Sequence, residues 1–269
     1  MSTDVPYSFP FGQPVQPVSC GQPGNRDCLV IGSTPSSLCM RWRVPGGKLV
    51  QGFAIDNEPS PFWDGHDQDA LLKIWKQTVC WQPTWGDVGP TRQNGHHGQW
   101  LNQQVLIPLG VSRDRVCATT LIDTFHANEA TRHRIDEHYR PFIDRLGLRP
   151  CALANQLSNS DLTREAVTTQ RDRLLALMQS AAVQTMVTLG TASYKVVLEL
   201  LGPAAAQVPT SLLGDGPTYG QPQTIILNGR SLRWYAFVSP SAPVSMQRMH
   251  TAWSARHGVK PLMALGSFK

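Results

Sequence analysis

The sequence contains no Cys-x-x-Cys pair, although it has six cysteines in 269 residues. Cysteines at that spacing are typical of zinc sites and redox motifs, so the sequence indicates neither. Several cysteines stand inside apolar, strand-like segments, which favours buried free thiols in a reducing compartment over disulfides or a metal site. An iron–sulfur cluster is also disfavoured, because Cys20 and Cys28 lack the paired spacing of cluster ligands.

The sequence also lacks a signal-peptide core and any apolar run long enough to cross a bilayer. We therefore expect a soluble, cytoplasmic protein. No Gly-x-Ser-x-Gly elbow, Walker loop or Gly-x-Gly-x-x-Gly motif is present, which disfavours an unrelated α/β hydrolase or nucleotide-binding protein. The formal net charge of +5 is compatible with a polyanionic partner.

Short apolar runs alternate with amphipathic segments along the chain. Runs rich in Val, Ile and Leu without polar alternation are typical of parallel strands covered on both faces, and they occupy residues 28–32, 115–123, 185–189 and 234–238. Helices are predicted over residues 67–80, 99–109, 131–147, 161–182, 191–201 and 245–257. This alternation predicts an α/β fold, a three-layer sandwich with a central parallel four-stranded sheet flanked by helices. Residues 1–26 are predicted to form an extended N-terminal arm, and residues 27–269 a single domain.

Two long segments, residues 38–66 and 203–230, are predicted to be irregular connections. Loops longer than about 15 residues inside a compact domain are usually functional or disordered, and the aromatic residues of the first segment argue against disorder. A further loop ends in His96 and His97 between glycines. This pair could bind a metal, but no third ligand stands at short spacing, which favours a mobile turn.

Four short motifs carry a resemblance to a known family. They are Gly32-Ser33-Thr34-Pro35-Ser36, Pro61-Phe62, Thr188-Leu189-Gly190-Thr191-Ala192 and Ser239-Pro240-Ser241. Their order along the chain resembles the uracil-DNA glycosylase superfamily, in style closest to its mismatch-specific and broad-specificity branches. The resemblance covers most of residues 27–257. It implies a monofunctional DNA glycosylase that acts on double-stranded DNA as a monomer, without a metal or other cofactor.

The resemblance also implies roles for individual residues, because an enzyme that acts on a base inside a duplex must first flip the nucleotide out. Phe62 would stack on the flipped base, or it is an ordinary core aromatic. Val244 or Met246 would fill the vacated stack. The other candidates for base binding are Ser33, Ser36, Thr120, Asp123 and Ser239. The other candidates for contacts with the DNA backbone are Ser37, Ser241 and Arg248.

The chain departs from the family where the chemistry is done. Ser33 and Thr34 replace the water-positioning acidic or Asn residue of the first motif, and Ser239 replaces the final His. The Asn that reads uracil has no clear counterpart, which argues against standard uracil excision. An oxocarbenium-like transition state still needs a carboxylate or polar group nearby. The candidates are Asp56, Glu58, Asp64 and Thr34, although Asp56 and Glu58 are equally open to interpretation as solvated loop charges.

The first motif also bears on the identity of the base. Ser36 stands where the most uracil-selective branch has a tyrosine that blocks five-substituted pyrimidines, so space beside C5 is expected. A carboxylate such as Asp123 can accept a hydrogen bond from the N4 amine of cytosine and would repel O4 of uracil. We therefore predict excision of a modified pyrimidine, such as 5-hydroxymethyl- or glucosylated cytosine in phage DNA, in anti-phage defence. The alternatives are a uracil or mismatch glycosylase of DNA repair and a catalytically silent DNA-binding member of the fold.

Overall fold

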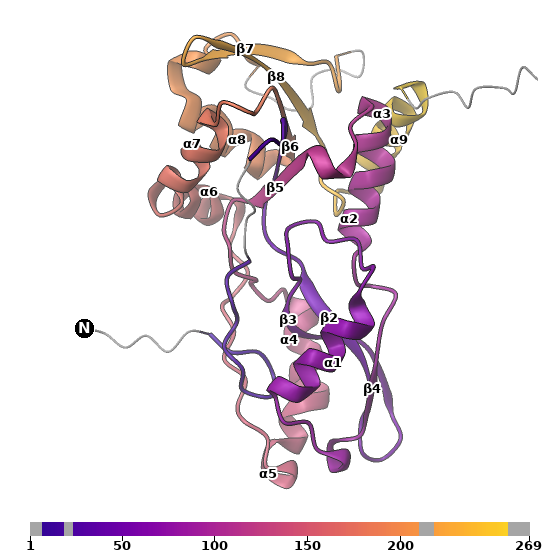
Figure 1. Cartoon of the computed structure of the whole chain (residues 1–269). Helices are drawn as coiled ribbons and strands as arrows, with labels where there is room; N and C mark the ends of the chain where they lie inside the picture. Colours follow the sequence, from indigo (N-terminus) through magenta and orange to yellow (C-terminus); the bar gives the residue numbers. More distant parts are fainter. Residues whose placement is uncertain (1–6, 19–23, 210–217, 258–269) are drawn as a thin grey trace, which may run out of the picture.

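The computed structural model describes residues 7–18, 24–209 and 218–257 and places two β-sheets in different halves of an elongated molecule (Figure 1). One sheet has five strands and the other has three. The chain forms the first strand of the larger sheet, leaves it to build the smaller sheet, and then returns to complete the larger one.

The larger sheet has the strand order β5-β1-β6-β8-β7. Its neighbours pair in parallel except β7 and β8, which are antiparallel. The strands are β1 (Cys28–Gly32), β5 (Val116–Thr120), β6 (Thr185–Leu189), β7 (Gln223–Leu227) and β8 (Arg230–Phe237). The four predicted strands are thus confirmed, but the prediction of a four-stranded, all-parallel sheet is wrong. The fifth strand lies in the segment predicted to be irregular, and the Asn228-Gly229 turn joins it to β8 with both residues at positive φ, as tight hairpins favour.

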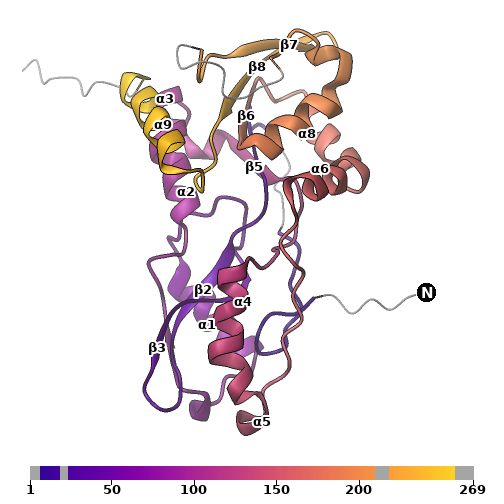
Figure 2. The same ribbon diagram turned by 180° about the vertical axis from the view of Figure 1, so that it is seen from behind.

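Helices cover both faces of this sheet (Figures 1 and 2). Leu29 and Ile31 pack with residues of α6 (Asn159–Thr168), α7 (Arg171–Gln179) and α8 (Thr191–Leu201). Cys28 and Val30, which alternate with them along β1, pack instead with residues of α2 (His96–Leu101) and α9 (Val244–His257). Because both faces of β1 are buried, its sequence is apolar throughout. This half of the molecule is therefore a three-layer α/β sandwich around a mixed, mostly parallel sheet.

The smaller sheet corrects the prediction that residues 38–66 are irregular. Its strands β2 (Ser37–Arg43), β3 (Leu49–Asn57) and β4 (Asp87–Gly89) are antiparallel in the order β3-β2-β4. Two register shifts interrupt the pairing of β2 with β3, so the sequence has no clean polar alternation. Trp42 and Phe53 of this sheet pack with Trp75 of α1 (Gln68–Thr78) in a separate hydrophobic core.

The remaining helices differ from the predictions more in extent than in place. Residues 96–109 are continuously helical through α2, a π-helical turn (Asn102–Leu106) and α3 (Ile107–Leu109). The helix predicted over 161–182 is two helices, and it begins earlier because the Ser158 hydroxyl accepts a hydrogen bond from the Asp161 N–H. The region predicted as 131–147 consists of α4 (Glu129–Arg134), a π-helical turn (Ile135–Tyr139), a 3-10 turn (Arg140–Phe142) and α5 (Ile143–Leu146). Further 3-10 turns are Pro83–Trp85, Arg113–Arg115 and Gly202–Ala205.

Residues 7–18 of the predicted N-terminal arm lie against the rest of the molecule. Phe9, Phe11 and Val15 are buried. The ring of Phe11 lies 5.4 Å from that of Trp75 and 5.0 Å from that of Tyr139, so this segment contributes to the core of the smaller sheet. Residues 1–6 and 19–23 of the arm, and Cys20 with them, lie outside the described residues.

The five described cysteines are free thiols. Burial raises the pKa of the Cys28 thiol to about 12 and that of Cys39 to about 11, so both are neutral at physiological pH. In the described part of the chain, every helix is too short or too polar to traverse a bilayer.

Candidate functional site

Three of the quoted motifs meet at the carboxyl edge of the parallel strands. Gly32 ends β1, Gly190 follows β6, and Ser239 lies just beyond β8. Gly190 has φ +91°, and a Cβ built on it would lie 3.2 Å from Cβ of Ser239 and 3.5 Å from Oγ of Ser33. The absence of a side chain at Gly190 therefore lets these loops approach one another, at the edge where open α/β sheets bind ligands.

A pocket of about 420 Å³, which we call the motif pocket, opens beside these loops. This volume falls within the range of about 300–1,000 Å³ found for small-molecule sites. Its lining combines the loop after β1 and the loop after β8 with the end of β3 and the start of α2. The described lining residues are Thr34, Pro35, Ser36, Ser37, Cys39, Glu58, Gln93, His96, His97, Phe125, His126, Asn128, Gln156 and Ser241.

Glu58 is the one carboxylate among the described residues of this lining, and its relative exposure is 3%. Its backbone N–H donates to the Ser36 carbonyl at 2.9 Å, which holds it beside the first motif. Oε1 accepts a hydrogen bond from the Gly95 N–H at 3.1 Å. Burial raises the pKa of Glu58 to about 8 and outweighs the opposing effects of Gly95 and the nearby Ser36 hydroxyl. Glu58 is therefore mostly protonated at neutral pH, and it is not a solvated loop charge.

His97 connects the first motif with the last. Its Nδ1 lies 2.8 Å from Oγ of Ser36, and its Nε2 lies 3.3 Å from Oγ of Ser241. Burial lowers the pKa of His97 to about 4, so the ring is neutral and has one N–H donor and one acceptor nitrogen. One serine must therefore donate to the ring and the other accept from it. This arrangement makes a hydrogen-bonded bridge across the pocket.

The sequence reasoning missed this role of His97, because it interpreted the His pair as a metal-binding pair or a mobile turn. In the structure both residues begin α2. Gly98 explains the close fit of this helix, since a Cβ there would lie 2.2 Å from the Phe62 carbonyl oxygen. Among the described residues, no cluster of three or more His, Cys, Asp or Glu side chains could hold a metal ion. The glycines on both sides of the pair were the available signal, because glycines permit such close packing.

The other two candidate carboxylates lie elsewhere. Asp56 faces a separate pocket of about 320 Å³ that residues of the N-terminal segment and α1 also line, and burial raises its pKa to about 6. Asp64 pairs with His66, with Oδ1 2.7 Å from Nδ1. Neither residue lines the motif pocket, whereas Glu58 lines both pockets. Of the three carboxylates, the structure brings only Glu58 together with Thr34 and Ser36.

Phe62 is packed rather than open to the pocket. Its relative exposure is 8%, and it belongs to the core cluster beneath the first motif. A Cβ on Gly32 would lie 2.4 Å from Cζ of Phe62, so the ring lies directly on the backbone at the end of β1. Phe62 has φ +57°, a conformation uncommon for a bulky residue. The alternative interpretation as a core aromatic thus has direct structural support.

The candidates at the end of β5 do not reach the pocket. Thr120 is 1% exposed, and its hydroxyl donates to the Ile122 carbonyl at 2.6 Å. The backbone carbonyl of Asp123 accepts a hydrogen bond from the Val18 N–H at 2.7 Å. Neither residue is among those that line the pocket.

Ser33 and Ser239 are not among the lining residues of the pocket and lie near Gly190. Ser33 Oγ is 3.4 Å from Ser193 Oγ, at the start of α8. Ser37 and Ser241 do line the pocket.

The start of α9 carries the two residues predicted to fill the vacated base stack, which we call the wedge candidates. Val244 is 68% exposed, whereas Met246 packs against the core cluster that contains Phe62. Arg248 is exposed on the same helix. Val244 is therefore the better placed of the two wedge candidates, three residues after the pocket residue Ser241.

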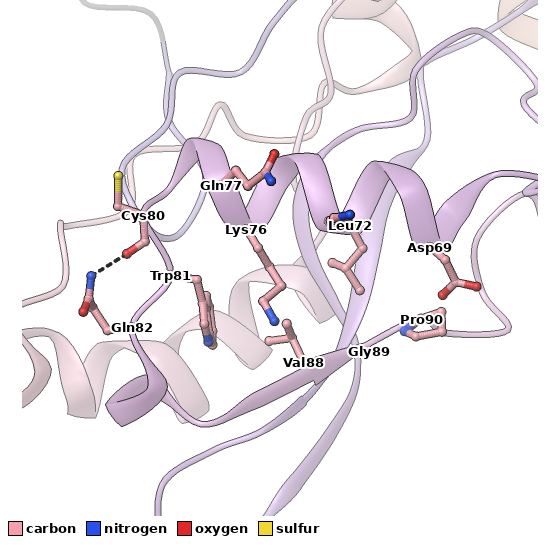
Figure 3. Close-up of a pocket in the computed structure, with 11 residues that line it drawn as sticks. Asp69, Leu72, Lys76, Gln77, Cys80, Trp81, Gln82, Val88, Gly89 and Pro90 are labelled. Atoms are coloured by element: carbon pink, nitrogen blue, oxygen red, sulfur yellow. Dashed lines mark hydrogen bonds between the residues drawn. The ribbon is translucent and has the colours of Figure 1, made fainter.

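A second, wider groove lies between α1 and β4 in the other half of the molecule (Figure 3). It has a volume of about 600 Å³, and Leu72, Trp81 and Val88 give it an apolar floor beside Lys73 and Lys76. None of the quoted motifs contributes a residue to it. We therefore take the motif pocket as the candidate site.

No family model matches the chain, and no curated protein matches it.

Proposed function

We propose that the protein is a DNA glycosylase that flips a base into the motif pocket and cleaves its N-glycosidic bond, leaving an abasic site. One observation carries this proposal. Motif residues that are far apart in the sequence, Ser36 and Ser241, line one pocket with a buried carboxyl group, that of Glu58. Hydrolysis through an oxocarbenium-like transition state requires such a group near C1′.

The surroundings of the pocket support DNA as the substrate. Serine hydroxyls at 37 and 241 are suited to phosphate contacts. Val244 is an exposed apolar side chain of the kind that inserts between base steps. The volume of about 420 Å³ leaves space for a base with a substituent, which favours a modified pyrimidine such as 5-hydroxymethyl- or glucosylated cytosine of phage DNA. We extend the proposal to a cytoplasmic monomer that acts on double-stranded DNA without a cofactor, in anti-phage defence.

The test is formation of abasic sites under single-turnover conditions. Duplexes that each carry one uracil, one 5-hydroxymethylcytosine or one glucosylated 5-hydroxymethylcytosine are incubated with excess protein and cleaved with alkali. We expect strand cleavage at a modified cytosine. If no duplex of the panel is cleaved, the glycosylase proposal fails. Cleavage at uracil alone would instead indicate a repair enzyme.

Single substitutions then identify the carboxylate. We expect Glu58→Gln to abolish most of the activity and Asp56→Asn and Asp64→Asn to retain more of it, because only Glu58 lines the motif pocket. Glu199→Gln, at an exposed position of α8, is the matched control. Full activity of all three carboxylate variants would exclude a catalytic role for this segment.

A catalytically silent DNA-binding protein is the second candidate. The neutral side chains of Ser33 and Thr34 in the first motif, and Ser239 in the last, favour it, because none of them can carry a negative charge or supply an imidazole. Binding to modified duplexes without any abasic sites in the same assay would support this candidate.

A further inference from the structure

The carboxyl group of Glu58 has one oxygen without a partner. Oε1 accepts the hydrogen bond from Gly95, but Oε2 is buried and makes no hydrogen bond within the described part of the chain. An unpaired buried polar oxygen destabilises the fold, so a fold keeps one only where something compensates for that cost. Because Glu58 lines the motif pocket, a bound base is a candidate partner for Oε2.

Burial favours the neutral form of Glu58, against the opposing effects of Gly95 and the nearby Ser36 hydroxyl. In the separate pocket of about 320 Å³ that Glu58 also lines, Asp56 is the other titratable side chain among the described residues. The titratable side chains that line the motif pocket with Glu58 are Cys39 from β2, His96 and His97 from α2, and His126 from the segment after β5. None of the described lining residues is Lys or Arg. Burial raises the pKa of the Cys39 thiol to about 11 and lowers that of His97 to about 4, so both are uncharged at neutral pH. The lining therefore offers no strong cation to stabilise a carboxylate.

Pyrimidines differ in how easily they leave a sugar. Uracil can depart as an anion, because two carbonyl oxygens share the negative charge. Cytosine has an amine in place of one carbonyl, so its anion is more basic, and it departs readily only after protonation of its ring. A general acid beside the base therefore helps an aminopyrimidine much more than it helps uracil.

We propose that Glu58 Oε2–H donates its proton to the departing base, which fits the site to aminopyrimidines rather than to uracil. This inference rests on the proposed glycosylase function. The N-glycosidic bond breaks, its electron pair stays with the base, and the Glu58 proton neutralises that base. Water then forms the new bond to C1′ and returns one proton to the Glu58 carboxylate, so the enzyme is regenerated.

Two bases with the same C5 substituent test the inference. Duplexes carry 5-hydroxymethylcytosine or 5-hydroxymethyluracil, which differ in the group at C4 and in the proton on N3. Single-turnover excision is measured for wild type and Glu58→Gln. We expect Glu58→Gln to lower the excision rate of 5-hydroxymethylcytosine about 100-fold or more, because general-acid catalysis typically contributes a factor of this size. On the uracil analogue we expect a loss of less than about tenfold. Equal losses on the two bases overturn the inference while the glycosylase function stands.

The pH profile of the wild type is a second readout that needs no variant. Because burial raises the pKa of Glu58 to about 8, excision of 5-hydroxymethylcytosine should fall about tenfold per pH unit above that value. Residual excision by Glu58→Gln should be independent of pH over the same range. A wild-type rate that is constant or rises from pH 7 to 9.5 contradicts the inference. If the wild type excises neither base but cleaves glucosylated 5-hydroxymethylcytosine, the loss in Glu58→Gln and the pH profile are measured on that base, with the same outcomes. If no base of either panel is excised, the glycosylase proposal fails, and this inference fails with it.

Discussion

Ser36, in the loop after β1, and His97, at the start of α2, are joined by a hydrogen bond of 2.8 Å between Oγ and Nδ1. The other ring nitrogen of His97 reaches Ser241, in the loop after β8. These serines belong to the first and last motifs, so a residue outside every quoted motif fixes their separation. The width of the pocket thus depends on one neutral imidazole.

The first prediction concerns this bridge. His97→Ala leaves two serine hydroxyls without their partner, and a typical hydrogen bond contributes about 0.5–1.5 kcal/mol, so we expect a loss of about 1–3 kcal/mol in the free energy of unfolding. Urea denaturation at pH 7 measures it. The abasic-site rate should fall at least about tenfold, since misplaced loops disturb the geometry of the reaction. His133→Ala, on an exposed part of α4, is the control and should change stability by no more than about 0.5 kcal/mol. A His97→Ala variant as stable and active as that control would show that the bridge is dispensable.

The second prediction is independent of function. The pKa of Glu58 is raised from 4.5 to about 8 in the folded protein, so the folded state binds the proton more tightly than the unfolded state does. The contribution of this group is fully present below about pH 4.5 and is lost as the pH rises through 8. Glu58→Gln removes this titration. The variant should therefore gain stability relative to wild type between pH 5 and 9, by a few kcal/mol at most.

Urea denaturation at pH 5, 7 and 9 measures this difference. Asp56, whose pKa is also raised, titrates in both proteins, so its contribution cancels. Glu199→Gln should follow the wild-type curve. Parallel curves for wild type and Glu58→Gln would mean that Glu58 titrates normally in the folded protein.

The third prediction concerns the contact between Gly32 and Phe62. Gly32→Ala places a methyl group where the Phe62 ring now lies, and overpacking of this kind costs about 1–3 kcal/mol. Phe62→Leu shortens the ring side chain and should also destabilise the protein, because Phe62 is 8% exposed. The double variant should lose less stability than the sum of the losses in the two single variants, because the smaller side chain leaves space for the methyl group. Urea denaturation of the four proteins completes the cycle, and strict additivity would contradict the contact.

The sequence predicted the elements whose burial is uniform. Residues 28–32 and 185–189 are buried on both faces, and their continuous apolar sequence marks them as strands. The smaller sheet was missed because its register shifts and Gly52 disturb the alternation that identifies a half-buried strand. Strand β7 could have been predicted, since Asn228-Gly229 is a strong hairpin signal.

The candidate site was predictable only in part. Ser36 and Ser241 could be proposed because short motifs surround them, and Glu58 could be proposed as one of three carboxylates. Glu58 is a better candidate than Asp56 because it lines the motif pocket and Asp56 does not, and only the fold shows which pocket each residue lines. His97 could not be assigned a role, because its two partners are 61 and 144 residues away in the sequence.

The last prediction concerns Val244, which is 68% exposed at the start of α9. A wedge is needed only where a base must leave a stacked duplex, so Val244→Ala should slow excision from double-stranded DNA about tenfold and leave single-stranded DNA nearly unaffected. The free energy of unfolding should change by no more than about 0.5 kcal/mol, because the side chain lies at the surface. Ile226→Ala is the matched control, since Ile226 is 58% exposed on β7 and belongs to none of the motif loops. Equal slowing on both kinds of DNA would assign Val244 to base binding rather than to opening of the duplex.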